Sequence, residues 1–525
     1  MMFTLALFAY LATASAYIWP SPQLDALESL RFPAEFSFIP SFLEPCGTFS
    51  SPAGDGDEEI SGRSNAADWI RTAYHDMATH NVVDGTGGMD ASIRFAEEQA
   101  RPENAGNGFS NTLSVLTQVS SHNVSVADLL ALGLVLAIEK CGGPQIAFRG
   151  GRIDAEEPNI PGVPEPQQDL DSHIASFARQ GFTKEEMIGL VACGHTFGGV
   201  QHDPFPDIVP ELNDPHNVES VAHFDSTSTN FDNNIATKYI NGTTLNPLVV
   251  GTNATTNSDQ RIFGSDGNVT MLSFAKSHQH FASTCADLFA RMIDTVPSGV
   301  QLTEVITPLP VKPELQPLTI DGDILQFAGS IRFWNLTENP DRVVQIIWDD
   351  HVGGVHNLTL LPSQERTPSN FMTWYDFGPT EDVEFLSLDA TAGITNMQFT
   401  LDDKLEDQGG VGFAVQDALV FSTTSCRTST SPPAAKFDVA VRRGVNVTRM
   451  YTEDEVKDAT GHGFLVERYS FSPVEPGAAT NTPYTFWTAN LTQNATSYVT
   501  AEIDGAKISV GPIAAFLALP SCPEL

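Results

Sequence analysis

The chain has 525 residues, of which 27 are Lys or Arg and 65 are Asp or Glu, so its formal net charge is −38. Such an acidic chain lacks the positive charge with which proteins neutralise nucleic-acid phosphates or dock on anionic membranes. Because 41% of its residues are hydrophobic, the chain can build packed cores, and wholesale disorder is excluded. Its length predicts about two to four domains.

The N-terminus carries a short apolar run that ends in an A-x-A site, Ala14-Ser15-Ala16. This pattern predicts a secretory signal peptide over residues 1–16. N-x-S/T sequons follow at Asn123, Asn241, Asn253, Asn268, Asn335, Asn357, Asn446, Asn490 and Asn494. Behind a signal peptide they indicate a secreted, extracellular glycoprotein of a eukaryote. Six cysteines fit an oxidising compartment, although the sequence alone does not choose among their possible pairings.

Helical patterns fill the chain up to about residue 300. Ser64 is placed to cap one helix, and Ser125 opens a second, whose apolar run Leu129–Ile138 predicts a buried position. Thr183 and Glu186 form the capping box of a third helix. These starts predict a mainly α-helical first domain.

The pattern changes at about residue 308. Four prolines, Pro308, Pro310, Pro313 and Pro317, predict a stiff linker over residues 306–318. Beyond it, short runs rich in β-branched and aromatic residues predict a β-rich, sandwich-like region; they lie at Val343–Trp348, Phe399–Leu401, Phe413–Phe421 and Phe437–Val441. We expect either two β units, over residues 319–426 and 436–525, or one continuous sandwich.

Two segments of the helical part carry candidate chemistry. In Arg71-Thr72-Ala73-Tyr74-His75-Asp76, Arg71 and His75 are four residues apart and share one helix face. An arginine beside a neutral histidine suits a site where one group takes a proton and the other stabilises negative charge. In the second segment, Ala192-Cys193-Gly194-His195-Thr196, His195 is expected on the apolar face of a capped helix. Taken alone, the first pair is more often a surface pair, and His195 is more often a core histidine.

Taken in this order, the two segments resemble the plant–fungal–bacterial haem peroxidase superfamily, and most closely its secreted fungal, ligninase-like branch. Further motifs agree: Gly88-Met89-Asp90-Ala91-Ser92, Glu98 with Asn104-Ala105-Gly106, Gly151-Arg152-Ile153-Asp154-Ala155 before Pro164-Glu165-Pro166, and Phe224-Asp225-Ser226-Thr227 with Phe231-Asp232. The resemblance covers about residues 40–300. It implies a mainly α haem peroxidase domain over residues 17–305, followed by an unrelated β-rich extension.

The resemblance also implies a role for each matched residue. His195 would be the axial ligand of the iron in haem b, with Asp266 as the partner of its other ring nitrogen. His75 would move a proton between the two oxygens of hydrogen peroxide, and Arg71 would stabilise the departing oxygen and the ferryl group. Asn104 would accept a hydrogen bond from His75 and keep it basic.

Two calcium sites are implied as well, and their oxygen donors suit Ca²⁺. The first set is Asp76, Gly88, Asp90 and Ser92; the second is Thr196, Asp225, Thr227, Asn230 and Asp232. The resemblance further implies a disulfide between Cys46 and Cys141. Cys193–Cys285 and Cys426–Cys522 would complete the set, and a buried free thiol at Cys193 is the alternative.

The chain departs from the family pattern at three places. The positions of the branch's manganese ligands carry Ser64, Asp68 and Gln201, so one acid remains and manganese oxidation is not expected. Leu190 replaces the surface tryptophan through which lignin-type enzymes oxidise large substrates. Tyr74 stands where Phe or Trp is usual, either as packing or as an oxidisable ring. Small phenolic or aromatic donors are therefore expected.

The leading prediction is an enzyme, a secreted monomeric haem peroxidase that reduces hydrogen peroxide and oxidises small organic donors, without nucleic-acid or membrane partners. The alternative is a non-catalytic peroxidase-like scaffold whose β region binds cell wall or polysaccharide. Exposed tryptophans in the β region would favour the alternative, although sandwich tryptophans are more often in the core. The many acids of the chain suit work in acidic surroundings.

Overall fold

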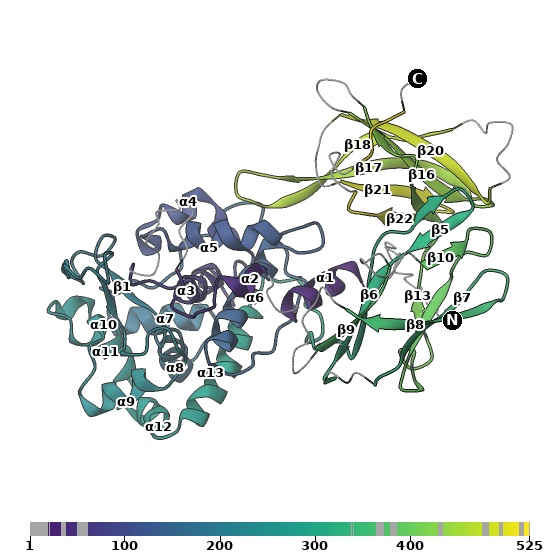
Figure 1. Ribbon diagram of the computed structural model, residues 1–525. Helices are drawn as coiled ribbons and strands as arrows, with labels where there is room; N and C mark the ends of the chain where they lie inside the picture. The colour runs from purple at the N-terminus through teal and green to yellow at the C-terminus, as the bar shows by residue number, and fades with distance from the viewer. Residues whose placement is uncertain are drawn as a thin grey trace, which may run out of the picture. The chain divides into compact units, whose positions relative to one another are not determined.

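The computed structural model describes residues 19, 21–32, 38–49, 61–337, 339, 341–363, 372–378, 386–428, 434–474, 482–492, 497–513 and 519–523. The predicted signal peptide and the Asn494 sequon lie outside these residues. The chain forms two compact units, one of residues 29–306 with 457–463, the other of residues 307–456 and 464–525 with the N-terminal segment up to Glu28 (Figure 1). Within the described ranges, every helix is too short or too polar to cross a membrane.

The first unit is mainly helical, as predicted (Figure 1). Its α-helices are α2 Phe38–Ser41, α3 Asn65–Met77, α4 Ala96–Gln99, α5 Gly108–Leu116, α6 Val126–Lys140, α7 Leu170–Arg179, α8 Lys184–Gly194, α9 Asn234–Asn241, α10 Pro247–Val250, α11 Ser258–Phe263, α12 Val269–Lys276 and α13 His278–Ile293. Helix α1, Pro22–Arg31, crosses the boundary between the two units. Short 3-10 turns are η2 Ser92–Arg94, η3 Pro102–Asn104, η4 Thr117–Val119 and η5 Ala254–Thr256, and a two-stranded sheet pairs β1 Gly199–Gln201 with β2 Val221–His223.

The helices that carry the candidate site begin at the predicted caps. The Ser64 hydroxyl accepts the Ala67 amide at the start of α3, and the Ser125 hydroxyl accepts the Asp128 amide at the start of α6. Helix α8 has the capping box of Thr183 and Glu186. Helix α6 is buried from residue 126 to 138 and forms the centre of the unit, against which α3 packs.

The second unit consists of strands (Figure 1). They are β3 Val311–Leu315, β4 Thr319–Asp321, β5 Ile324–Phe327, β6 Gly329–Trp334, β7 Val344–Asp349, β8 Val355–Pro362, β9 Met372–Phe377, β10 Leu386–Asp389, β11 Asn396–Leu401, β12 Lys404–Glu406, β13 Phe413–Ala414, β14 Leu419–Ser422, β15 Cys426–Arg427, β16 Ala435–Arg442, β17 Val447–Lys457, β18 Gly463–Ser470, β19 Ser472–Pro473, β20 Tyr484–Leu491, β21 Ser497–Ile503 and β22 Ala506–Val510. The sheet orders are β10-β5-β4-β14-β16-β20-β19, β12-β11-β7-β8-β9-β6-β3 and β18-β17-β21-β22. The prediction of a helical domain followed by a β-rich region is confirmed.

Three segments differ from the predicted domain limits. Strand β14 pairs with β16, so one sheet joins residues from both predicted β units. The predicted linker contains strand β3, which lies at the end of its sheet, where a strand tolerates proline. The N-terminal segment also belongs with the strands, because the buried Glu28 carboxylate pairs with Lys312 at 2.9 Å and with Arg332.

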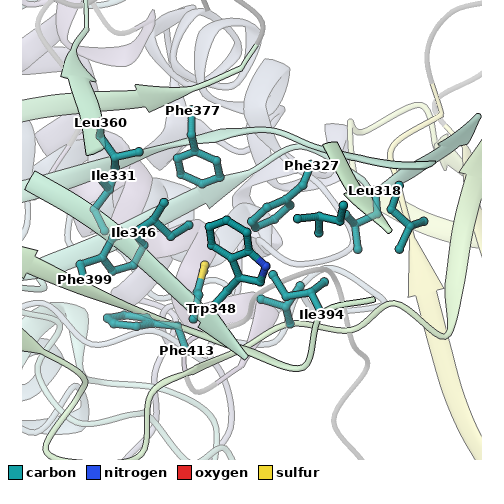
Figure 2. Close-up of a cluster of buried hydrophobic side chains, with 14 of the residues drawn as sticks. Leu318, Phe327, Ile331, Ile346, Trp348, Leu360, Phe377, Ile394, Phe399 and Phe413 are labelled. Carbon is teal, nitrogen blue, oxygen red and sulfur yellow. The ribbon is translucent and has the colours of Figure 1, made fainter. Parts of the chain in front are cut away.

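Two of the four tryptophans of the β region are buried, whereas Trp334 and Trp487 are partly exposed. Trp348 is 8% exposed in a core with Phe327, Phe377 and Phe399 (Figure 2). Trp374 is 3% exposed. The burial of Trp348 and Trp374 is explained by packing in the protein interior and not by a carbohydrate-binding surface.

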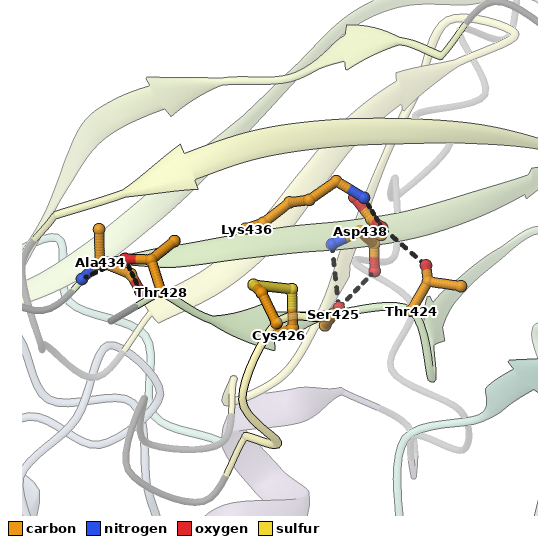
Figure 3. The surroundings of a disulfide bond; sticks show 8 residues. Thr424, Ser425, Cys426, Thr428, Ala434, Lys436 and Asp438 are labelled. Atoms are coloured by element: carbon orange, nitrogen blue, oxygen red, sulfur yellow. Dashed lines mark hydrogen bonds and ion pairs between the residues drawn. A yellow bond between two sulfur atoms is a disulfide. The ribbon is translucent and has the colours of Figure 1, made fainter. Parts of the chain in front are cut away.

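All three predicted disulfides are present: Cys46–Cys141, Cys193–Cys285 and Cys426–Cys522. The third lies beside a polar cluster in which the Ser425 hydroxyl accepts the Asp438 amide at 2.9 Å (Figure 3). The Asp438 carboxylate also accepts from Lys436 at 2.6 Å. This disulfide closes the C-terminal end of the chain onto strand β15.

Candidate active site

Helix α3 presents the first group of predicted residues. Arg71 and His75 both line a cavity of about 770 Å³, within the range of ordinary ligand and cofactor pockets. The opposite side of α3 is fixed by fully buried residues such as Trp69 and Ala73. Helical spacing and this packing together direct Arg71 and His75 into the cavity.

His75 is held by Asn104, as predicted. The His75 Nδ1 atom lies 2.7 Å from Asn104 Oδ1, and Asn104 Nδ2 donates to the Glu98 carbonyl at 2.8 Å. Because the Asn104 amide donates to Glu98, its oxygen faces His75, and His75 Nδ1 must carry the proton. Burial and the nearby Arg71 cation lower the pKa of His75 well below its ordinary value. The ring is therefore neutral, with Nε2 available as a base.

Arg71 is fixed from two sides. Its guanidinium donates to the Ala105 carbonyl at 3.0 Å and lies 4.4 Å from the centre of the Phe109 ring. Burial lowers the pKa of Arg71 to about 10, and Asp68 opposes that effect. Arg71 is still a cation at neutral pH, so it can stabilise negative charge beside His75.

Helix α8 delivers His195 at its C-terminal end. His195 lines the same cavity, and its ring stacks on Phe224 with centroids 4.1 Å apart. The preceding Gly194 leaves open space where a side chain would project. The disulfide between Cys193 and Cys285 ties this end of α8 to α13.

The predicted partner of His195 is wrong. His195 Nδ1 lies 2.8 Å from the Oδ2 atom of Asp259, which is 1% exposed and also accepts from Asn246 at 2.7 Å. Asp266 instead accepts from the amide and hydroxyl of Thr270, at 2.9 and 2.7 Å. Asp259 is the second residue of helix α11 and shares its buried face with Ile262, three residues on, whereas Asp266 follows the helix in a turn. That apolar spacing was the available sequence signal for Asp259.

The Tyr74 side chain is held by the packing of its ring. Its ring stacks on Phe177 with centroids 5.9 Å apart, and its hydroxyl is buried without a hydrogen-bond partner among the described residues. Burial raises the pKa of Tyr74. The stacking and the burial favour the packing interpretation.

The positions of the branch's manganese ligands form an ion-pair cluster instead. Arg63 donates to Asp68 at 2.6 Å and to Glu219 at 3.2 Å, and Gln201 donates to Glu219 at 2.6 Å. Ser64 is used as the helix cap. Sequence analysis missed Glu219, which lies on a long loop. The Arg63 guanidinium bridges both carboxylates and supplies the positive charge that a metal ion would bring.

The structure gathers most of the second calcium set. Asp225 Oδ1 accepts from the Thr227 amide at 2.7 Å, and the Thr196 hydroxyl donates to the Asp232 carbonyl at 2.8 Å. Asp225 Oδ2 is buried with no partner among the described residues, and burial together with Asp232 raises the pKa of Asp225. The Asn230 side chain is exposed and contacts only Thr229 in the described part of the chain. An unpaired buried carboxylate oxygen near a second acid fits a bound cation.

The first calcium set differs. The Asp76 carboxylate accepts the backbone amides of Asp90, Ala91 and Ile93, at 2.8–3.1 Å. The Gly88 amide donates to Thr79, and the Ser92 amide donates to the Asp90 carboxylate at 3.1 Å. These acids are already satisfied by protein donors.

Two histidines face one cavity, one beside an arginine and one bonded to a buried carboxylate, and this arrangement fits the site that the sequence predicts. A family model described as "Peroxidase" matches residues 57–282. This match and the relatives below support the haem peroxidase superfamily for this segment. The superfamily implies haem as the cofactor.

Three relatives extend this finding. A "WSC domain-containing protein" of Arthroderma benhamiae is 37% identical over 358 residues, which are 66% of this chain and 48% of that protein. "L-ascorbate peroxidase 5, peroxisomal" of Arabidopsis thaliana is 29% identical over 228 residues, 42% of this chain and 76% of that protein. A "Putative heme-binding peroxidase" of Aspergillus fumigatus is 32% identical over 154 residues, 28% and 47% of the two chains. This chain thus spans about half the length of the first and third of these relatives.

Proposed function

We propose that the chain is a secreted haem peroxidase that reduces hydrogen peroxide with electrons from small phenolic or aromatic donors. The observation that carries the proposal is the pair His75 and His195, which line one cavity. His75 is bonded to a neutral amide oxygen, and His195 is bonded to a carboxylate. The signal-peptide pattern and three disulfides support secretion, because disulfides persist in oxidising compartments.

The residues on the proximal side fit haem b. The Nδ1–H group of His195 donates a hydrogen bond to Asp259, so Nε2 is the nitrogen that would bind iron. The stacked Phe224 ring fixes the imidazole plane. When bound, haem supplies the redox-active iron at which the peroxide bond is split. Asp259 orients the His195 ring, and Asn246 holds Asp259 in place.

On the distal side, His75 transfers the proton and Arg71 stabilises the negative charge. His75 Nε2 takes the proton from one oxygen of hydrogen peroxide and returns it to the other, which leaves as water. Arg71 stabilises the negative charge that develops on the leaving oxygen. Overall, one hydrogen peroxide, two protons and two electrons from donors give two waters.

The donor class follows from the rim of the cavity. Arg63 already bridges Asp68 and Glu219, so the rim lacks an unpaired acid cluster among these residues for Mn²⁺. Phe205, Pro166 and Val163 line the cavity and offer apolar contacts to an aromatic ring. Organic donors are therefore proposed, together with one calcium ion held by Asp225 and its neighbours.

The test is an absorption spectrum of the purified full chain, followed by addition of hydrogen peroxide. A Soret band that changes within seconds of peroxide addition is expected, with turnover of phenolic donors and none of Mn²⁺. Normal haem loading without any reaction with peroxide would contradict the enzyme. Turnover of Mn²⁺ alone would contradict only the donor class.

A further inference from the structure

Asn159 lies among the oxygens of the first calcium set. Its Nδ2 atom is 3.0 and 2.8 Å from the two carboxylate oxygens of Asp90, 3.0 Å from Ser92 Oγ and 3.3 Å from Thr79 Oγ1. Asp90, Ser92 and Thr79 are all buried. One neutral amide group thus faces four oxygen atoms from three residues.

A calcium ion and this amide compete for the same space. Ca²⁺ binds oxygen at about 2.3–2.6 Å, so an ion bound to Asp90 and Ser92 would overlap the Asn159 nitrogen. The Asp76 carboxylate in turn accepts three backbone amides. Backbone and side-chain N–H groups therefore occupy, with hydrogen bonds, the oxygens of two buried acids to which a cation would bind.

Asn159 is also linked to the distal histidine. Its backbone amide donates to the side chain of Glu98, which is fully buried. The Glu98 carbonyl accepts from Asn104, and Asn104 in turn holds His75. The Asn159 side chain fixes the loop of Asp90, and its backbone fixes Glu98.

We propose that Asn159 takes the place of a calcium ion on the distal side and acts as a positioning residue for His75. The chain then holds at most one calcium ion, at the set that contains Asp225. The positioning role rests on the proposed peroxidase function, whereas the metal content does not.

Metal content tests the replacement. Mass-spectrometric metal analysis of the purified full chain should give no more than one calcium ion per chain. Asn159→Asp replaces the amide donor with a carboxylate of the same size and should add one calcium ion. Asn81→Asp is the control, because Asn81 also donates to an acid, Asp84, but on an exposed loop, and should add none. Two calcium ions in the wild type, one of which survives Asp232→Asn and is lost in Asp90→Asn, would overturn the proposal.

Kinetics tests the positioning role separately. Asn159→Ala should slow the reaction with peroxide per bound haem by about tenfold, as for other residues that orient a site from behind, and leave the KM for the donor unchanged. With added Ca²⁺, Asn159→Asp should react with peroxide at the wild-type rate. After a chelator has removed the Ca²⁺, the same variant should react slowly. A lower melting temperature with an unchanged rate in Asn159→Ala would overturn the positioning role. An inactive wild type would count against the proposed function and leave the metal analysis valid.

Discussion

The two histidines of the cavity are held by partners of different charge. His75 Nδ1 lies 2.7 Å from a neutral amide oxygen of Asn104, and His195 Nδ1 lies 2.8 Å from a carboxylate oxygen of Asp259. The lengths are nearly equal, so the difference lies in charge. A neutral partner leaves the imidazole free to take and release a proton, whereas a carboxylate makes the opposite nitrogen a stronger metal ligand. The same side chain is thereby fitted to two tasks.

Each partner is itself held by a further residue. Asn104 ends the turn η3 and donates to the Glu98 carbonyl, while Asp259 lies in the first turn of α11 and accepts from Asn246. Neither histidine depends on its own helix for its hydrogen bond. Variants of the partners therefore test each histidine without moving helix α3 or α8.

Removing His195 should have the largest effect. His195→Ala deletes the nitrogen that would bind iron, so we expect loss or a strong shift of the Soret band and no turnover. The measurement is haem content per chain, by absorption spectroscopy, in wild type and variant. His216→Ala changes an exposed histidine outside the cavity and should leave the spectrum unchanged. Full haem loading with an unaltered Soret band in His195→Ala would refute its role.

Removing His75 should preserve haem and slow the peroxide reaction. His75→Ala deletes the base, and positioned acid–base catalysis is worth about 10²–10⁴-fold. Stopped-flow mixing of the haem-loaded variant with hydrogen peroxide measures this rate. Tyr74→Phe, which keeps the adjacent ring and its stacking on Phe177, should react at nearly the wild-type rate. A fast His75→Ala variant would remove the distinction between the two histidines.

The carboxylate partner can be tested against the residue that the sequence suggested. Asp259→Asn should lower haem affinity or peroxide reactivity by about 10–100-fold, the usual cost of losing an outer partner of a metal ligand. Asp266→Asn should change neither, because Asp266 bonds only Thr270 among the described side chains. Haem titration and peroxide kinetics of both variants provide the measurement. The reverse order of effects would return the role to Asp266.

Local signals in the sequence predicted most of the site. Arg71 and His75 follow from helical spacing, and the caps at Ser64 and Thr183 set the helix starts that carry them. Caps act within one turn, so the sequence shows them directly. Asp259 was missed because a loop rich in sequons separates it from His195, and loop length hides which acid reaches the ring.

Non-local pairing accounts for the differences in the fold. The parallel pairing of β4 with β14 and the antiparallel pairing of β14 with β16 join distant segments, and no local pattern states which strands meet. The buried ion pair of Glu28 with Lys312 could not be predicted either, because more than half of the chain lies between the two residues. Asn159, in a loop without regular structure, gave no signal at all.

The smallest effect at neutral pH should come from giving His75 the partner type of His195. Burial and Arg71 hold the pKa of His75 well below the ordinary value of about 6.5, so the wild type should keep a neutral base, and its full rate with peroxide, to acidic pH. Asn104→Asp places a carboxylate on Nδ1 and should raise that pKa by about 1–3 pH units, moving the acid limb of the peroxide rate toward neutrality.

Since the folded pKa of His75 lies below its unfolded value, its protonation favours unfolding, and stability is lost as pH falls below about 6.5. Asn104→Asp should make this loss shallower. An acid limb at the same pH in both proteins, with the exposed control Asn81→Asp unchanged, would show that partner charge does not separate the two histidines.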